Sequence, residues 1–190
     1  MEEGQEKEKE MNEPMRTDKD VSGLTRAYEE LFAPIRNNPI KYLEIGTAYG
    51  DSLFWARKFF SKATIVGADR VDPIIKPDDV AFYKVDQNDS DSLILLGKEQ
   101  GPFDIIIDDA SHQAKETENT FNNLYPHLKQ GGMYVIEDWG AGYLPQFGNC
   151  IGTERLVLDL VWKYGGSVVK LDEGGSDKVM RGCFAVILKK

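Results

Sequence analysis

The sequence predicts an α/β protein with a doubly wound, mostly parallel sheet. Short apolar segments alternate along the chain with longer segments whose apolar residues recur at helical spacing. The apolar segments are nearly continuous, which is typical of strands that are buried on both faces of a parallel sheet. The chain has 190 residues, which is enough for one domain with a substantial core.

The N-terminal segment, residues 1–20, is almost purely polar and is dominated by Glu, Lys and Asp. We expect a flexible acidic tail here, and a charged helical arm used in oligomer contacts is the alternative. One domain would then cover residues 21–190. A first helix is predicted from apolar residues at helical spacing that stop before Pro39; they are Leu24, Tyr28, Leu31, Phe32 and Ile35.

From residue 41 onward, predicted strands and helices alternate, which implies parallel strands joined by crossover helices. The strands are predicted at residues 41–45, 64–68, 82–85, 103–107 and 133–136, and the helices at residues 51–60, 90–99, 114–125 and 153–164. Two further strands, residues 167–171 and 183–188, are joined by a turn-rich segment and predict a hairpin. The hairpin would add one antiparallel strand to the sheet.

Composition excludes several classes of function. The chain has 32 acidic and 23 basic residues and no basic run that could follow a phosphate backbone, so we expect no nucleic-acid partner. Cys150 and Cys183 are far apart and lack CxxC spacing, which favours free thiols in a reducing compartment. No apolar stretch could span a bilayer or serve as a signal peptide, so we expect a cytoplasmic protein without a membrane partner.

Acidic residues follow two of the predicted strands. Asp108 and Asp109 precede His112 after one strand, and Glu137 and Asp138 follow the other. Parallel strands bring their carboxyl ends to one edge of a sheet, where open α/β folds bind ligands. Four crowded carboxylates repel one another unless a positive charge lies among them. The sequence therefore predicts a site for a hard divalent cation.

A glycine-rich turn, Glu44 to Gly50, links the first strand of the sheet to a helix. Gly46 permits a sharp turn and a close approach of a ligand to the backbone. The helix that begins near Ser52 offers free N–H groups to an anionic end of a ligand. Glu44, Gly46, Thr47, Gly50 and Ser52 are therefore candidate cofactor contacts. A tight turn without a ligand is the alternative.

The next two strand ends carry polar residues of the kind that bind a nucleoside. Asp69 could accept hydrogen bonds from both ribose hydroxyls, while Asp86 and Gln87 could bind an adenine edge. Solvated strand ends or helix caps are the alternative for each residue taken singly. Together with the glycine-rich turn, the three residues predict an adenosine pocket.

With these motifs in place, the chain resembles the class I S-adenosylmethionine-dependent methyltransferases from about Leu31 to Lys190. The resemblance rests on the Glu-x-Gly-x-x-x-Gly turn, the acidic residue after the second strand and the terminal hairpin. It implies a seven-stranded Rossmann-like sheet of order 3-2-1-4-5-7-6, with strand 7 antiparallel. It also implies S-adenosylmethionine as the cofactor.

A narrower resemblance comes from Asp108-Asp109-Ala110-Ser111-His112 and from Val135-Ile136-Glu137-Asp138. These segments are similar to motifs of the mycinamicin-type and macrocin-type sugar O-methyltransferases and the related cephalosporin-hydroxylase-like group. The resemblance implies that Asp109, Glu137 and Asp138 hold Mg²⁺ and that His112 is the general base. Ala110 stands where the family usually has Gly, so we expect strain at that turn if its φ is positive.

Some roles remain open between two interpretations. Asp108 is expected to face the methionine end of the cofactor or to cap its loop. His112 is either the base or a residue at a helix start. Trp139 and Tyr143 are candidate walls of a substrate pocket, with packing under the loop as the alternative, which we favour for Phe147.

We therefore expect a metal-dependent O-methyltransferase whose acceptor is a hydroxyl of a sugar or a glycosylated natural product. A catechol-like phenol acceptor and a non-catalytic protein that binds S-adenosylmethionine are the alternatives. The small-molecule acceptor is the expected partner. We also expect a homo-oligomer, because the family that the chain resembles tends to oligomerise.

Overall fold

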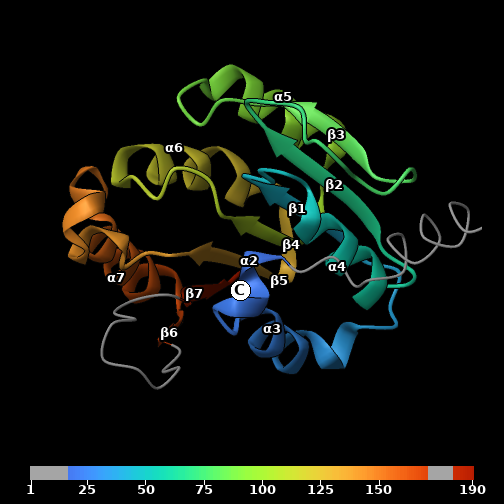
Figure 1. Cartoon of the computed structure of the whole chain (residues 1–190), viewed down its shortest axis with the longest axis horizontal. Helices are drawn as coiled ribbons and strands as arrows, with labels where there is room; N and C mark the ends of the chain where they lie inside the picture. Colours follow the sequence, from blue (N-terminus) through green and yellow to red (C-terminus); the bar gives the residue numbers. More distant parts are fainter. Residues whose placement is uncertain (1–16, 171–181) are drawn as a thin grey trace, which may run out of the picture.

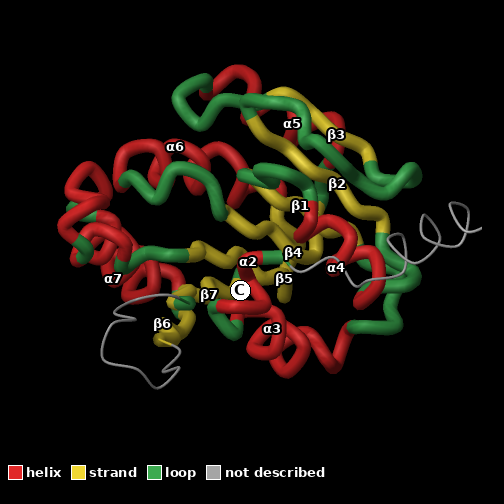
Figure 2. Tube along the Cα trace, viewed as in Figure 1, coloured by secondary structure: helices red, strands yellow, loops and turns green. Residues whose placement is uncertain are grey.

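The computed structural model describes residues 17–170 and 182–190, and within them it contains one seven-stranded sheet (Figures 1 and 2). The strand order is β3-β2-β1-β4-β5-β7-β6, as predicted. All neighbouring strands are parallel except β7, which is antiparallel to β5 and to β6. The strands are β1 (Lys41–Ile45), β2 (Thr64–Asp69), β3 (Ala81–Lys84), β4 (Phe103–Asp108), β5 (Leu128–Glu137), β6 (Gly166–Lys170) and β7 (Cys183–Leu188).

Strand β5 begins earlier than the predicted residue 133. Leu128 pairs with Phe103 before the register between β4 and β5 shifts, and the pairing resumes at Ile105 and Met133. The extra residues of β5 include Gly131, whose φ of 76° is a left-handed value that glycine adopts without a steric penalty. The pair Gly131-Gly132 therefore lies inside β5, at an irregularity in its pairing with β4, and not before the strand begins.

Helices cover both faces of the sheet (Figure 1). Leu93, Phe121 and Val157 belong to one apolar cluster, so α5, α6 and α7 pack on one face. Tyr28 and Leu53 belong to the other cluster, beneath α3 and α4. The helices are α2 (Asp18–Val21), α3 (Leu24–Phe32), α4 (Asp51–Phe59), α5 (Ser90–Gln100), α6 (Ala114–Leu124) and α7 (Thr153–Tyr164), with 3₁₀ turns at Ala33–Ile35, Tyr125–His127, Ala141–Tyr143 and Pro145–Cys150.

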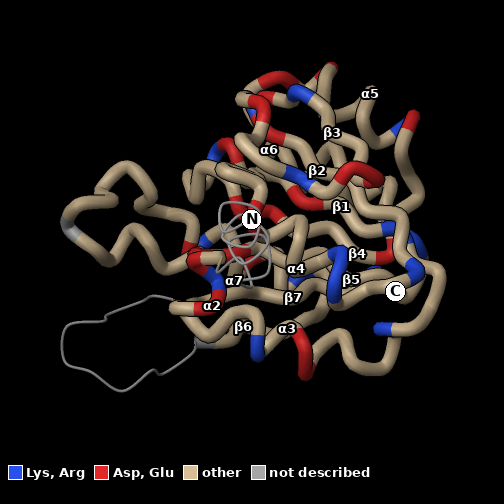
Figure 3. The backbone as a smooth tube through the Cα atoms, turned by 45° about the vertical axis from the view of Figure 1, so that its right-hand side comes forward, with Lys and Arg blue, Asp and Glu red and all other residues tan. Residues whose placement is uncertain are grey.

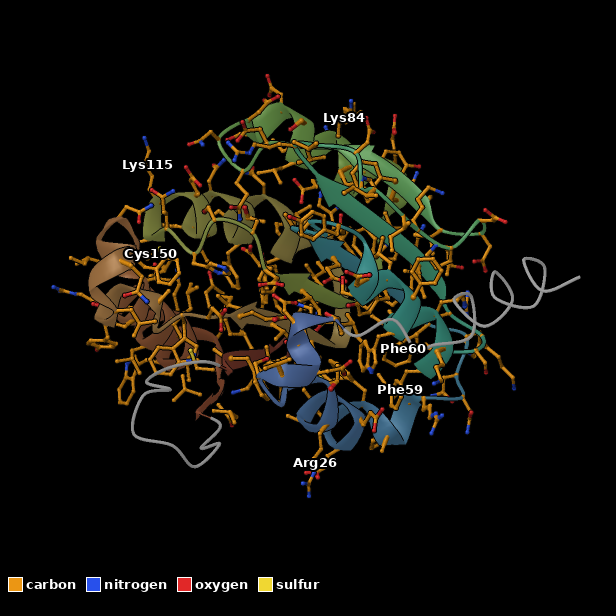
Figure 4. The ribbon with its side chains drawn as sticks, viewed as in Figure 1. Arg26, Phe59, Phe60, Lys84, Lys115 and Cys150 are labelled. Atoms are coloured by element: carbon orange, nitrogen blue, oxygen red, sulfur yellow. The ribbon has the colours of Figure 1, made fainter. Side chains whose placement is uncertain are left out.

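Aromatic side chains dominate the contact between α3 and α4. Phe59 and Phe60 lie at the end of α4 and face the rest of the molecule, whereas Arg26 on α3 points into solvent (Figure 4). Phe60 packs with its ring centroid 5.7 Å from that of Phe32, and the rings of Trp55 and Phe59 are stacked at 5.4 Å. Phe32, Phe59 and Phe60 are buried in the core, and Trp55 is partly buried against it.

The boundary predicted for the N-terminal tail is wrong at its last residues. Residues 1–16 lie outside the described residues, but Thr17 to Asp20 are part of the folded domain. Thr17 caps α2, because its hydroxyl accepts a hydrogen bond from the backbone N–H of Lys19 at 3.3 Å. Lys19 is only 4% exposed although it stands in a charged segment. The whole hairpin connection, residues 171–181, lies outside the described residues.

Charge is distributed over many elements. Figure 3 shows Lys and Arg interspersed with Asp and Glu in the described part of the chain. Within that part, no helix combines the length and the apolar character needed to cross a membrane.

Candidate active site

The two acidic residues at the centre of the site lie one position beyond neighbouring strands. Asp109 follows β4, and its backbone N–H donates to the carbonyl of Ile45 at 2.9 Å. Asp138 follows β5, and its N–H donates to the carbonyl of Cys183 at 2.7 Å. The adjacent strands therefore extend their hydrogen-bond ladders by one residue, and this places both carboxylates at the carboxyl edge of the sheet.

Two residues of the site have left-handed backbone conformations. The φ angles of His112 and Asp138 are 56° and 47°, and an L-residue in this region carries a cost of about 1–2 kcal/mol. Hydrogen bonds stabilise both conformations. The N–H of Asp138 donates to the carbonyl of Cys183, and the Thr153 hydroxyl donates to the carbonyl of His112 at 2.6 Å. Strain of this kind gathers at functional sites. Ala110 is not among the positive-φ residues, so the condition for strain at that turn is not met; the left-handed conformation is found two residues later, at His112.

Asp109, His112 and Asp138 come together as predicted. One possible ligand atom from each lies within 4.8 Å of the other two, and Nε2 of His112 is 3.9 Å from Oδ1 of Asp109. Oδ1 of Asp138 is buried and has no hydrogen-bond partner among the described residues. An unpaired buried carboxylate oxygen is costly unless a cation or donor satisfies it. Two carboxylates in this arrangement fit a hard divalent cation, with the imidazole of His112 beside them.

Glu137, the third predicted metal ligand, is not in that group of three; it is buried deeper, where its partner is Lys19. The Lys19 ammonium donates to Oε1 of Glu137 at 2.7 Å, lies 3.4 Å from Oε1 of Glu44 and also donates to Oδ2 of Asp109. Glu44 and Glu137 are almost completely buried. The positive charge that the crowded acids require is therefore partly supplied by the protein itself.

The electrostatics of this cluster follow from burial and mutual repulsion. Burial opposes the charged form of Lys19, but Asp109, Glu137 and Glu44 outweigh it and hold its pKa well above the ordinary value. Burial and the nearby Asp109 raise the pKa of Glu137 despite the opposing effect of Lys19. Burial and Asp109 also raise the pKa of Asp138. A further positive charge among these acids would stabilise their ionised forms.

Gly46 fits the glycine-rich turn against the loop that carries the acids. Its φ is 88°, and a Cβ added there would lie 2.2 Å from the carbonyl oxygen of Asp109 and 2.5 Å from the Cα of Ala110. Only glycine permits this close approach. The turn and the Asp109 loop are thus packed closely together where the predicted cofactor residues meet the predicted metal ligands.

A cavity of about 240 Å³ lies where the adenosine pocket was predicted. Asp69 and Asp86 both line it, and Asp69 also accepts the N–H of Ala48 at 3.0 Å, which fixes the loop above. The cavity extends past Gly46 to Asp109 and Ala110. Arg70 lines it as well, a residue that sequence reasoning missed because a charged side chain after a strand has no distinctive pattern.

Three predicted cofactor contacts are engaged within the protein instead. Gln87 borders the cavity, but its amide donates to Asp108 and Thr120 and accepts the N–H of Ser111 at 3.0 Å. Asp108 is 2% exposed and also accepts the hydroxyl of Tyr134 at 3.3 Å. Burial and the adjacent Asp109 raise the pKa of Asp108 to about 8. Glu44 accepts the hydroxyl of Tyr42 at 3.1 Å.

Two larger cavities meet at the same acids. One, of about 510 Å³, is lined by Thr47 of the glycine-rich turn and Ser52 of α4, together with Asp109, His112 and Asp138. The other, of about 430 Å³, is lined by the same three residues and by Glu137 and Phe147. The hydroxyl of Thr47 is buried and has no hydrogen-bond partner among the described residues.

The predicted aromatic walls differ in position. Trp139 is partly buried and packs against the core cluster beneath α5, α6 and α7. Tyr143 is 61% exposed, and neither Trp139 nor Tyr143 lines the cavity of about 430 Å³. Phe147, for which packing under the loop was favoured, is 44% exposed and lines that cavity together with Leu144. The loop forms a 3₁₀ turn at Ala141–Tyr143. The apolar residues that line the cavity, Leu144 and Phe147, come after this turn.

Lys19 is the site residue that sequence reasoning missed most completely. A lysine in a polar, charged segment has the pattern of a solvated tail, and only Thr17 as a possible helix cap marked the start of structure. Helix α2 contains acidic residues on both sides of this lysine (Figure 3). Nothing in the local pattern indicates that the lysine turns inward.

Comparisons with known proteins identify the family of this chain. A family described as a methyltransferase domain matches residues 43–139. The mycinamicin VI 2''-O-methyltransferase of Micromonospora griseorubida is 36% identical over 150 residues, covering 71% of this chain and 37% of that protein. The demethylmacrocin O-methyltransferase of Streptomyces fradiae is 37% identical over 133 residues, covering 66% of this chain and 34% of that protein.

Among solved structures, the MycE methyltransferase of mycinamycin biosynthesis, in complex with Mg and SAH, superposes with a TM-score of 0.67 at 27% identity. The match covers 87% of this chain and 50% of that one. The chain thus spans little more than a third of the length of the curated relatives and half of the solved structure. The family match over residues 43–139 includes both acidic motifs and all of the glycine-rich turn, and we conclude that this chain belongs to the methyltransferase-domain family.

Proposed function

We propose that this chain transfers the methyl group of S-adenosylmethionine to a hydroxyl of a sugar on a natural product, with the help of a divalent cation. The observation that carries the proposal is the meeting of three cavities at Asp109. The relatives named as O-methyltransferases of mycinamicin VI and demethylmacrocin, and the neighbour that holds Mg and SAH, support the choice of acceptor and cofactors.

Each part of the site has a proposed role. Asp69 and Asp86 would bind the nucleoside in the first cavity, and the glycine-rich turn would bind the methionine part beside Thr47. Asp109, Asp138 and Glu137 would hold the cation, with Glu137 contributing from the inner side. The cavity lined by Phe147 and Leu144 would take the acceptor, because it opens on the same acids from the side away from the nucleoside.

The reaction is an in-line displacement. When bound, the sulfonium supplies an activated methyl group and the cation favours the ionised form of the acceptor hydroxyl. The acceptor oxygen forms a bond to the methyl carbon, the carbon–sulfur bond breaks, and its electron pair stays on the sulfur of S-adenosylhomocysteine. His112 would take the hydroxyl proton on its imidazole, which borders both larger cavities.

A methyl-transfer assay tests the proposal. The protein would be incubated with S-adenosylmethionine, Mg²⁺ and a panel of glycosylated macrolides and rhamnosylated aromatics, with catechol as the comparison acceptor. We expect methylation of a glycoside that stops with a chelator and returns with excess Mg²⁺. The His112→Ala variant should lose about 10²–10⁴-fold in rate while S-adenosylhomocysteine still binds.

The other outcomes separate the competing functions. Methylation of catechol alone would replace the sugar acceptor by a phenol. Binding of S-adenosylmethionine without transfer to any acceptor would indicate a binding protein. Activity that a chelator does not affect would contradict the metal-dependent mechanism. A homo-oligomer, a cytoplasmic location and the lack of a nucleic-acid partner stay predictions.

A further inference from the structure

Lys19 reaches the acidic cluster from an element outside the sheet. Helix α2 is short, and Lys19 is 4% exposed on it, whereas Asp18 and Asp20 on either side are exposed. Its ammonium contacts Glu137 at 2.7 Å and Glu44 at 3.4 Å, and it donates to Asp109. Burying an ammonium is expensive unless several charged acceptors compensate, and three carboxylates do so here.

Asp109 has two sides, and they face different groups. Its Oδ2 accepts from Lys19, while Oδ1 lies on the side of His112, 3.9 Å from Nε2. The inner side contains the buried Glu44 and Glu137, and the outer side contains the half-buried His112 and Asp138. Glu137, like Asp109, faces two kinds of surroundings: its Oε1 accepts a hydrogen bond from Lys19, and the residue also lines the acceptor cavity.

We propose that Lys19 is a positioning residue for the metal site: its ammonium holds the inner oxygens of Asp109 and Glu137 so that their other oxygens remain for the cation. The inference rests on the proposed function, because it presumes that Asp109, Glu137 and Asp138 bind the ion. Groups that orient metal ligands through their second oxygen commonly contribute 10- to 100-fold to metal affinity. The cation and Lys19 would then occupy the cluster together.

A competing interpretation is that Lys19 occupies the place of the ion and must leave when the ion binds. The two differ in the sign of their effects. If Lys19 positions the ligands, its loss weakens metal binding; if it competes with the metal, its loss strengthens binding. Removing a positive charge from an acidic cluster also attracts any cation, so the test must keep the net charge constant.

A charge-matched double variant meets this requirement. Lys19→Met with Glu44→Gln removes one positive and one negative charge from the inner side and leaves Asp109, Glu137 and Asp138 in place. Met preserves much of the aliphatic stem of Lys19, so α2 can still dock. Binding of Mn²⁺ would be titrated by electron paramagnetic resonance in the double variant, in Glu44→Gln alone and in the wild type. Asp20→Asn, at an exposed position of the same helix, is the control.

We expect the double variant to bind Mn²⁺ about 10- to 100-fold more weakly than the wild type, whose net charge it matches, while its affinity for S-adenosylhomocysteine changes only a few fold. A general loss of structure would lower both affinities, so the comparison separates positioning from folding. Unchanged or tighter Mn²⁺ binding in the double variant would overturn the inference and leave the proposed methyl transfer intact. A wild type that binds no Mn²⁺ would overturn the inference together with the metal-dependent mechanism.

Hydrogen–deuterium exchange on the wild type tests the same inference without a substitution. Binding effects are reciprocal, so if the docked Lys19 favours the metal, the metal must favour the docked Lys19. We expect added Mg²⁺ to slow exchange of the backbone amides of α2 and of Ser22, whose N–H bonds to Asp18 at 3.1 Å. Faster exchange on adding Mg²⁺ would show displacement of Lys19 and would contradict the proposal.

Discussion

Asp108 illustrates how adjacent residues of one motif acquire different roles. It shares a motif with Asp109, but its side chain points inward to Gln87 and Tyr134, at 2.8 and 3.3 Å. Successive side chains of an extended segment point to opposite sides, so only one of the two could reach the ligand edge. Asp109 does so, and Asp108 is a buried acid whose pKa is raised to about 8 by burial and by Asp109.

The raised pKa of Asp108 predicts a pH dependence of stability. The folded protein holds this proton between about pH 4 and pH 8, whereas the unfolded chain releases it, so stability falls as the pH rises through that range. Asp108→Asn cannot ionise and escapes this loss. The free energy of unfolding of the variant, relative to wild type, should therefore increase with pH by up to about 1.4 kcal/mol per unit.

Urea unfolding of both proteins at several pH values, with a chelator present, measures this difference. Glu44, Glu137 and Asp138 also have raised pKa values, but they are common to both proteins and cancel in the comparison. Parallel stability curves for the two proteins between about pH 5 and pH 8 would show that Asp108 is ionised in the folded state.

At the scale of the element, two glycines with similar backbone angles have very different surroundings. Gly46 and Gly131 have φ angles of 88° and 76°. A Cβ at Gly46 would collide with the backbone of Asp109, whereas a Cβ at Gly131 would meet no atom within 4 Å among the described residues. Alanine pays the cost of a left-handed conformation at both positions, but only at Gly46 must two segments also separate.

Gly46→Ala should therefore be far more harmful than its matched control. We expect Gly131→Ala to lower the free energy of unfolding by about 1–2 kcal/mol and to leave binding of S-adenosylhomocysteine unchanged. Gly46→Ala should lose cofactor binding as well as stability, because the turn and the Asp109 loop both border the nucleoside cavity. Calorimetric titration with S-adenosylhomocysteine and thermal unfolding would measure both effects. Equal losses in the two variants would mean that the conformational cost alone decides.

At the scale of the whole molecule, the sheet was predictable and parts of the site were not. Alternating apolar and helical segments predicted parallel strands joined by crossover helices, whereas the strand order came from the resemblance to the class I methyltransferases. Strand ends then located Asp109, His112 and Asp138. The burial of Lys19 and the internal hydrogen bonds of the Gln87 amide depend on side chains from elements distant in sequence. No local pattern encodes such contacts.

The three cavities meet at Asp109, and a cofactor bound there is expected to stabilise the protein as a whole. A ligand that binds only the folded state at 100 times its Kd stabilises that state by about 2.7 kcal/mol. For a chain of this size each kcal/mol raises the Tm by roughly 2–4 °C, so S-adenosylhomocysteine at that concentration should raise the Tm by roughly 5–11 °C. Differential scanning calorimetry would measure the shift.

Asp86→Asn provides the matched test of where that ligand lies. Asp86 lines the nucleoside cavity, and its carboxylate accepts the N–H of Asn88 at 2.8 Å, a contact that an amide oxygen can retain. The variant should therefore keep the Tm of the ligand-free protein but gain less from S-adenosylhomocysteine at the same concentration. An undiminished gain would place the nucleoside away from Asp86. The cofactor would then have to enter through the cavity beside Thr47 alone, and its route to Asp109 would no longer pass the end of β3.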